Sequence, residues 1–193
     1  LSRDVTKDRL EALQRAQDDG RARVVGHIVE QIRDGADPLE MLGRAVEALR
    51  GALAAEGVAV AVALDGGRLD VALRQGHATA VEAATAALHQ AVPEVGAAIR
   101  SAGGHALIVF RTRFRGAWNG IVAVARAPDA PAWSDEDHLL ARAVEAQLGV
   151  ILAQLGEQRR LEHLSRTDPL TGLLNRRALV ADLERRLARA DRG

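Results

Sequence analysis

Apolar and polar positions along the chain follow two different periods. Five helices are predicted, at 3–34, 38–55, 79–90, 93–100 and 134–165. The signals are apolar residues three or four positions apart, an alanine-rich composition and residues typical of helix starts. Buried or alternating apolar runs predict four strands that form two β-hairpins, at 58–64 with 69–74 and at 105–115 with 118–126. This order indicates an α+β fold, with an antiparallel sheet flanked by helices and long helices at both ends.

Capping and turn residues set several of these boundaries. Asp37, followed by Pro38 and an acidic third residue, is typical of a helix start, and Gly57 stands where the same helix is expected to end. Gly103-Gly104 is expected to close the helix at 93–100. Residues 134–137 form a capping box of the Ser-x-x-Asp kind. The long C-terminal helix is therefore expected to begin there.

The composition excludes several classes of function. Lys plus Arg and Asp plus Glu each number 26, so no net charge attracts nucleic acid or an anionic membrane. Cysteine is absent from the sequence, which excludes disulfides, thiolate zinc sites and thiol nucleophiles. The longest nearly unbroken apolar run, 58–64, is far shorter than the roughly 20 residues of a membrane span. We expect a cytoplasmic protein that binds neither nucleic acid nor membrane.

No cofactor motif stands out in the sequence. The six histidines are scattered, with no His-x-x-x-His pair: they are His27, His77, His89, His105, His138 and His163. Two Phe, two Trp and no Tyr give an aliphatic interior, whereas large flat ligands usually contact aromatic walls. We expect no metal site and no bound cofactor in this chain.

Three arginines alternate along the second hairpin and are the best candidate for an anion site. If strand geometry is regular, the side chains of Arg111, Arg113 and Arg115 lie on one face of the strand. There they could bind a phosphate or carboxylate. The alternative is a solvated hairpin end whose positive charge discourages edge pairing. Nucleotide binding that Arg113→Ala leaves unchanged would exclude the anion site.

The long C-terminal helix carries a second apolar pattern, which predicts a dimer seam. Its members recur at coiled-coil spacing and then slip by one residue: they are Val144, Leu148, Ile151, Leu155, Leu161 and Leu164. A second copy of the chain is the simplest partner, and the slip would let a parallel pair adopt two registers. The alternative is that the helix packs on the chain's own sheet, at least as far as Leu152.

A run near the C-terminal end resembles a known family. It reads Asp-x-Leu-Thr-Gly-Leu-x-Asn-Arg-Arg, and its defining residues are Asp168, Leu170, Thr171, Gly172, Asn175, Arg176 and Arg177. The run resembles the start of a GGDEF domain, the family that makes cyclic di-GMP from two GTP. The resemblance implies a parent diguanylate cyclase that needs Mg and GTP. The family's catalytic residues follow this run, so we expect no catalytic residue in this chain and a longer parent protein.

Two further segments resemble the GAF family of sensory domains. The first is the Trp-x-Gly strand at 118–124, and the second is the aromatic-polar-acidic helix start at 133–140. Together with the element order, they imply a GAF-like domain at 36–156. The expected organisation is an N-terminal helix or linker at 1–35, this domain, a signalling helix at 157–166 and the start of a GGDEF domain at 167–193.

The expected function follows from this order. The chain would be the sensory and dimerisation module of a diguanylate cyclase, passing a signal from an unknown small molecule or partner through a coiled-coil helix of a homodimer. The alternative is a GAF scaffold that binds no small ligand and serves protein–protein interaction. A third hypothesis, a GAF-containing regulator of transcription, is disfavoured because the run at 168–177 lies where its output module would begin.

Overall fold

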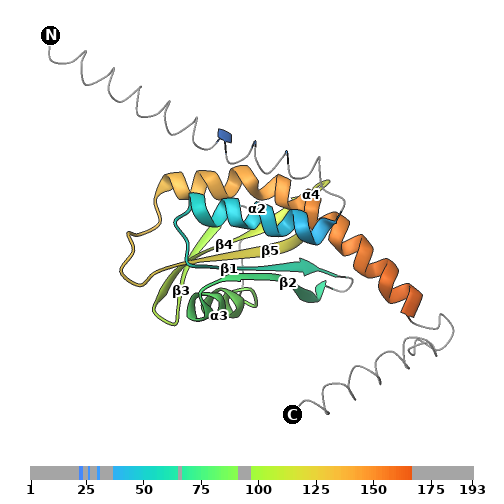
Figure 1. Ribbon diagram of the computed structural model, residues 1–193, viewed down its shortest axis with the longest axis horizontal. Helices are drawn as coiled ribbons and strands as arrows, with labels where there is room; N and C mark the ends of the chain where they lie inside the picture. Colours follow the sequence, from blue (N-terminus) through green and yellow to red (C-terminus); the bar gives the residue numbers. More distant parts are fainter. Residues whose placement is uncertain are drawn as a thin grey trace, which may run out of the picture. The chain divides into compact units, whose positions relative to one another are not determined.

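Five antiparallel strands form one sheet in the order β2-β1-β5-β4-β3 (Figure 1). The strands are β1 (Gly57–Ala63), β2 (Leu69–Gly76), β3 (Ala97–Ala102), β4 (His105–Phe114) and β5 (Ala117–Arg126), and the helices are α2 (Pro38–Ala52), α3 (Ala78–Ala87) and α4 (Asp135–Arg166). The computed structural model describes residues 22, 23, 26, 30, 37–64, 67–90 and 97–166, with side chains as far as Leu161. The predicted α+β fold is confirmed; most of the predicted N-terminal helix lies outside the described residues.

The sheet is covered on both faces. Helices α2 and α4 lie side by side on one face, and α3 lies on the other (Figure 1). Along β1 the valines at 58, 60 and 62 pack with α2 and α4, whereas Ala59 and Ala61 pack with α3. Because β1 is buried on both sides, its sequence is a continuous apolar run rather than an alternating one. On β1, bulky residues thus face α2 and α4, and small residues face α3.

Helix α3 approaches the sheet closely because the residues between them are small. The residues of α3 that face the sheet are alanines, and all are buried: Ala80, Ala83, Ala84 and Ala87. A Cβ placed on Gly57 would lie 2.6 Å from the backbone carbon of Ala80. Gly57 is therefore required by this contact, and the expectation that it ends α2 is wrong. That helix ends at Ala52, and Ala54 takes the positive φ of 46°.

The predicted helix at 93–100 is also wrong over its described part. Residues 97–102 form β3, which pairs with β4 from Ala97↔Phe110 to Ala102↔His105. Gly103 and Gly104 have φ of +55° and +80°, the positive values of a two-residue hairpin turn. Glycine pairs are a strong hairpin signal, but the alanines before them favour helix, and only pairing with β4 overrides that preference.

Arg126, at the end of β5, joins three elements at one corner of the domain. Its Nε donates to the carbonyl of Leu53 after α2 (2.8 Å), and its Nη1 and Nη2 donate to the two carboxylate oxygens of Asp137 in α4 (2.9 and 2.7 Å). The guanidinium also lies 3.9 Å from the ring centroid of Trp133. At 8% exposure, this cation is buried with all of these partners in place.

The predicted capping box of α4 is confirmed and belongs to the same cluster. The backbone nitrogen of Asp137 donates to Oγ of Ser134 (3.2 Å), and the backbone nitrogen of Ser134 donates to the Asp137 carboxylate (2.8 Å). Desolvation raises the pKa of Asp137, but hydrogen bonds from Arg126 and Ser134 outweigh it and hold that pKa below its ordinary value. The carboxylate therefore caps a helix and neutralises Arg126 at the same time.

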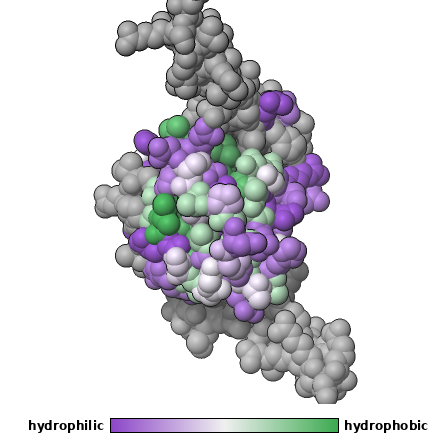
Figure 2. Space-filling model, turned by 90° about the vertical axis from the view of Figure 1, so that its left-hand side faces the viewer, coloured by the Kyte–Doolittle hydropathy of each residue, from purple (hydrophilic) through white to green (hydrophobic). Residues whose placement is uncertain are grey.

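Within the described residues, one helix is long and apolar enough to cross a membrane by length and composition alone, at Asp135–Leu161 of α4. Many of its apolar side chains are part of the core beside α2 and the sheet, as in a buried helix of a globular domain. The face shown in Figure 2 is mostly polar, with small apolar spots. Large apolar residues that are exposed in the described part are Leu39, Ile99, Leu139 and Leu161.

We predict that Asp137→Asn destabilises the domain by roughly 2–4 kcal/mol at neutral pH, because it leaves Arg126 buried without its counter-charge. Since the pKa of Asp137 is lowered in the folded state, its contribution is present above about pH 4 and is lost as the pH falls through the folded pKa. Urea unfolding from pH 7 to pH 3 measures this difference.

The matched control is Asp135→Asn, in the same first turn of α4 but exposed. We expect it to change stability by less than about 1 kcal/mol. Equal losses in the two variants at pH 7 would show that the Arg126 pair contributes nothing specific.

Candidate functional site

A groove between β2 and α3 is the candidate ligand site. It has a volume of about 410 Å³, is open to solvent, and has mostly apolar walls. Its lining residues come from β2, from α3 and from the turn that follows α3: Arg74, Val81, Glu82, Thr85, Ala86 and His89. This volume lies in the usual range of small-molecule sites, about 300–1,000 Å³. The sequence contained no motif that pointed to these residues.

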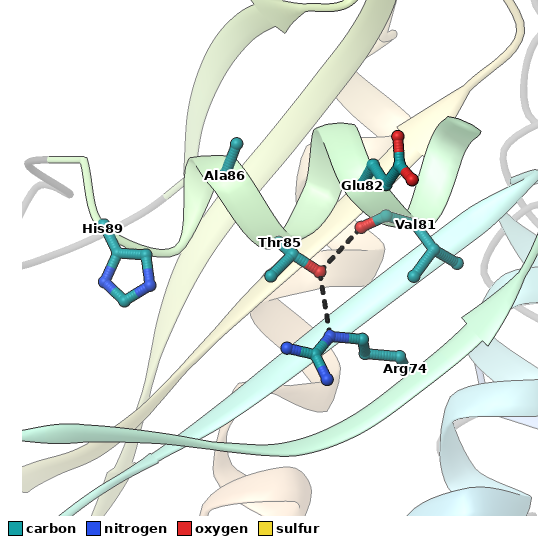
Figure 3. A pocket seen from close by; sticks show the side chains of 6 residues that line it. All are labelled: Arg74, Val81, Glu82, Thr85, Ala86 and His89. Carbon is teal, nitrogen blue, oxygen red and sulfur yellow. Dashed lines mark hydrogen bonds between the residues drawn. The ribbon is translucent and has the colours of Figure 1, made fainter. Parts of the chain in front are cut away.

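Arg74 is held in a defined orientation in this groove (Figure 3). Its Nε donates to Oγ1 of Thr85 (3.3 Å), and this hydroxyl donates to the carbonyl of Val81 one turn earlier (2.7 Å). Within the described part of the chain, Nη1 and Nη2 of Arg74 make no hydrogen bond. The guanidinium extends toward the end of the groove where His89 lies (Figure 3). The groove thus presents a positioned cation next to apolar surface.

The structure does not bring the three predicted anion-site arginines together. The Arg111 guanidinium lies 5.2 Å from the ring centroid of Trp118, and Nε of Arg113 lies 3.6 Å from the carboxylate of Glu145 on α4. Arg115, at the hairpin turn with φ of +51°, stacks on the ring of Phe114. A bulge between Thr112 and Arg113 interrupts the regular strand geometry on which the expectation of a shared face depended.

One of these arginines retains an unsatisfied donor. The Nε of Arg111 is buried and has no hydrogen-bond partner among the described residues. Such a group is costly to bury, and an anion would satisfy it. Anion binding by the hairpin arginines stays a prediction, now centred on Arg111 alone.

Hydrogen bonds join α4 to the sheet next to the bulge between Thr112 and Arg113. Nδ2 of Asn119 donates to the carbonyl of Gly149 in α4 (2.7 Å), and Oγ1 of Thr112 donates to Oδ1 of Asn119 (2.9 Å). Gly149 lies against the backbone of Arg113, and a Cβ there would collide with the Arg113 carbonyl oxygen. The sheet and the middle of α4 are therefore in direct backbone contact.

The residues of the predicted dimer seam differ in burial. Val144, Leu148, Ile151 and Leu155 are at most 4% exposed and belong to the chain's own core, so these four do not form an open seam. Their spacing was that of a core-facing helix, the alternative left open by the sequence. Leu161 is 57% exposed. The side chain of Leu164 lies outside the described residues, so pairing at the end of α4 stays a prediction.

The motif at 168–177, with all seven of its defining residues, lies outside the described residues. The chain divides into two compact units, 1–155 and 156–193, and the described part of the second is the end of α4.

In the described residues no group of three or more His, Cys, Asp or Glu side chains is placed to hold a metal. Glu56 lies between His77 and His105, with 3.9 Å from carboxylate oxygen to ring nitrogen in each pair.

Comparison with solved structures shows that the fold is GAF-like. The chain is similar to the GAF domain of a protein assigned as a sensor histidine kinase from Pseudomonas syringae pv. tomato, with 15% identity and a TM-score of 0.58 over 82% of this chain and 97% of that one. It is also similar to the GAF domain of an Acinetobacter phosphoenolpyruvate-protein phosphotransferase (12% identity, TM-score 0.55, 72% of this chain and 97% of that one).

A third similar structure is the GAF domain of A. aeolicus nlh2 in an inactive state, with 13% identity and a TM-score of 0.52 over 72% of this chain and 99% of that one. No protein-family model and no curated protein sequence matches the chain. At these identities the likeness establishes the fold, and the expected GAF-like architecture is confirmed at that level.

We predict that Gly149→Ala loosens α4 from the sheet and costs about 1–3 kcal/mol, because the added methyl group overpacks the contact with Arg113. Gly43→Ala is the matched control, since Gly43 also lies within a helix but its Cβ would meet nothing within 4 Å. We expect the control to stabilise the chain by up to about 1 kcal/mol. Thermal or urea unfolding compares the two, and changes of the same sign would contradict a tight contact at Gly149.

Proposed function

We propose that this chain is a sensory and regulatory module that passes a signal from a GAF-like domain into a helix. The observation that carries the proposal is the placement of α4. Its residues as far as Leu155 are part of the same core as the sheet, and Asn119 fixes its middle to β5. A change in sheet or α3 packing would therefore alter the position of the helix that continues to Arg166.

We further propose that the regulated output is a diguanylate cyclase. The support is the GGDEF-like run from Asp168 to Arg177, which follows α4 directly in the sequence. Catalysis would belong to a GGDEF domain of the parent protein, which needs Mg and GTP, and this chain would itself be no enzyme. Because the cyclic product joins two nucleotides, the output needs two subunits. A cytoplasmic homodimer paired through the end of α4, at Leu161 and Leu164, meets that need.

A ligand-free scaffold is the second candidate, and the α3 side of the sheet favours it. The buried residues on that side are mostly alanines, and α3 lies close to the strands. Native mass spectrometry of the purified chain separates the two candidates. A small molecule retained by the folded chain favours sensing, whereas a bare dimer favours the scaffold.

We predict that cysteines introduced singly at Leu161 and Leu164 both form disulfides between copies, because the two positions lie three residues apart on one stripe of the helix. In a mixture of the two variants we also expect a 161–164 disulfide, because the one-residue slip in the apolar pattern permits two registers. The chain has no native cysteine, so each product reports one position. Non-reducing electrophoresis after mild oxidation measures the crosslinked fraction.

Glu162→Cys is the matched control, because position 162 lies about 100° around the helix from Leu161 and about 160° from Leu164. We expect it to crosslink much more slowly than Leu161→Cys. A single invariant pairing pattern, with 161–161 and 164–164 disulfides but no 161–164 disulfide, would contradict a two-register helix pair. A monomer by light scattering would contradict the dimer itself.

A further inference from the structure

We propose that the groove between β2 and α3 binds a small aliphatic monocarboxylate, with the carboxylate on Arg74. The groove is separate from the alanine-filled interface between α3 and the sheet. It opens on the flank of α3 beside β2, which is an edge strand of the sheet (Figure 3). The role of this site as the input of a sensory module rests on the function proposed above. The proposal that the groove binds a carboxylate rests only on the geometry of the groove.

The guanidinium of Arg74 is prepared to receive a carboxylate. Thr85 accepts the Nε hydrogen and so fixes the plane of the group, while Nη1 and Nη2 make no hydrogen bond within the described part of the chain. Two parallel N–H donors match the two oxygens of a carboxylate. A side chain that is already oriented loses less conformational entropy when it binds.

The other lining residues of the groove determine which group attached to the carboxylate can bind. Val81 and Ala86 supply apolar wall on the same flank of α3, which suits a short alkyl chain. Glu82 lines the same groove, and its negative charge repels an anion more strongly as the charge of that anion increases, so it disfavours dicarboxylates and phosphate esters relative to a monocarboxylate. His89 lies at the end of the groove toward which Arg74 extends (Figure 3).

The test is a titration of the full chain with sodium hexanoate, followed by two-dimensional amide NMR. We expect saturable shifts of the Thr85 and Ala86 amides with a Kd of about 1 mM, since the groove is open to solvent. Hexanamide has the same alkyl chain without the charge, and succinate and inorganic phosphate carry more charge. We expect each of these three probes to bind at least about tenfold more weakly than hexanoate.

Two variants locate the site. Arg74→Gln removes the charge and should weaken hexanoate binding by at least about tenfold, whereas Thr85→Val removes only the acceptor that orients Arg74 and should weaken it by about threefold to tenfold. Arg68→Gln makes the same charge change outside the groove and should leave the Kd unchanged. Both Arg74 and Arg68 are exposed, so folding is not at risk.

Equal weakening by Arg74→Gln and Arg68→Gln, or tighter binding of phosphate than of hexanoate, would overturn the proposal. So would the absence of saturable shifts at Thr85 and Ala86. These outcomes are separate from the failure of the sensory function. That failure would appear as normal hexanoate binding with no change in crosslinking at Leu161.

Discussion

Arg126 is the constraint on which the rest of the domain depends. A buried guanidinium needs hydrogen-bond acceptors and a counter-charge, and here its partners come from the end of α2, the loop before α4 and the first turn of α4. Satisfying one cation therefore fixes where α2 ends and where α4 begins, relative to the end of β5. The direction in which α4 crosses the sheet follows from that corner, and the Asn119–Gly149 contact holds the helix at its middle.

The two faces of the sheet are built differently, and this difference explains why the groove lies beside α3. Valines and leucines pack with α2 and α4 in a thick layer, whereas alanines let α3 lie directly on the strands. A close, small-residue interface leaves little interior space between α3 and the sheet, so binding surface appears beside α3 instead, next to the edge strand β2. In the sensory function proposed above, the input would lie at the flank of α3 and the output would lie on the opposite face of the sheet, in α4.

Sequence patterns predicted the elements whose signals are local. The hairpin of β4 and β5, the Asp37 cap of α2 and the capping box of α4 all appear where residue types and spacing placed them. The failures concern residues whose role depends on a partner far away in sequence. Ala97–Ala102 forms a strand only because β4 lies beside it, and Gly57 is a glycine because the backbone of α3 passes over it.

The candidate site was not accessible from the sequence at all. Arg74 and Thr85 are unremarkable in their own elements, and only the packing of α3 beside β2 brings them into hydrogen-bond contact. The arginines of the second hairpin were conspicuous, yet a bulge and separate partners divide them. By itself the sequence determined the fold class and the starts of α2 and α4, because these depend on short-range periodicity and capping. Tertiary structure decided which apolar face of α4 is core and which arginine stands in a groove, because both depend on contacts between distant elements.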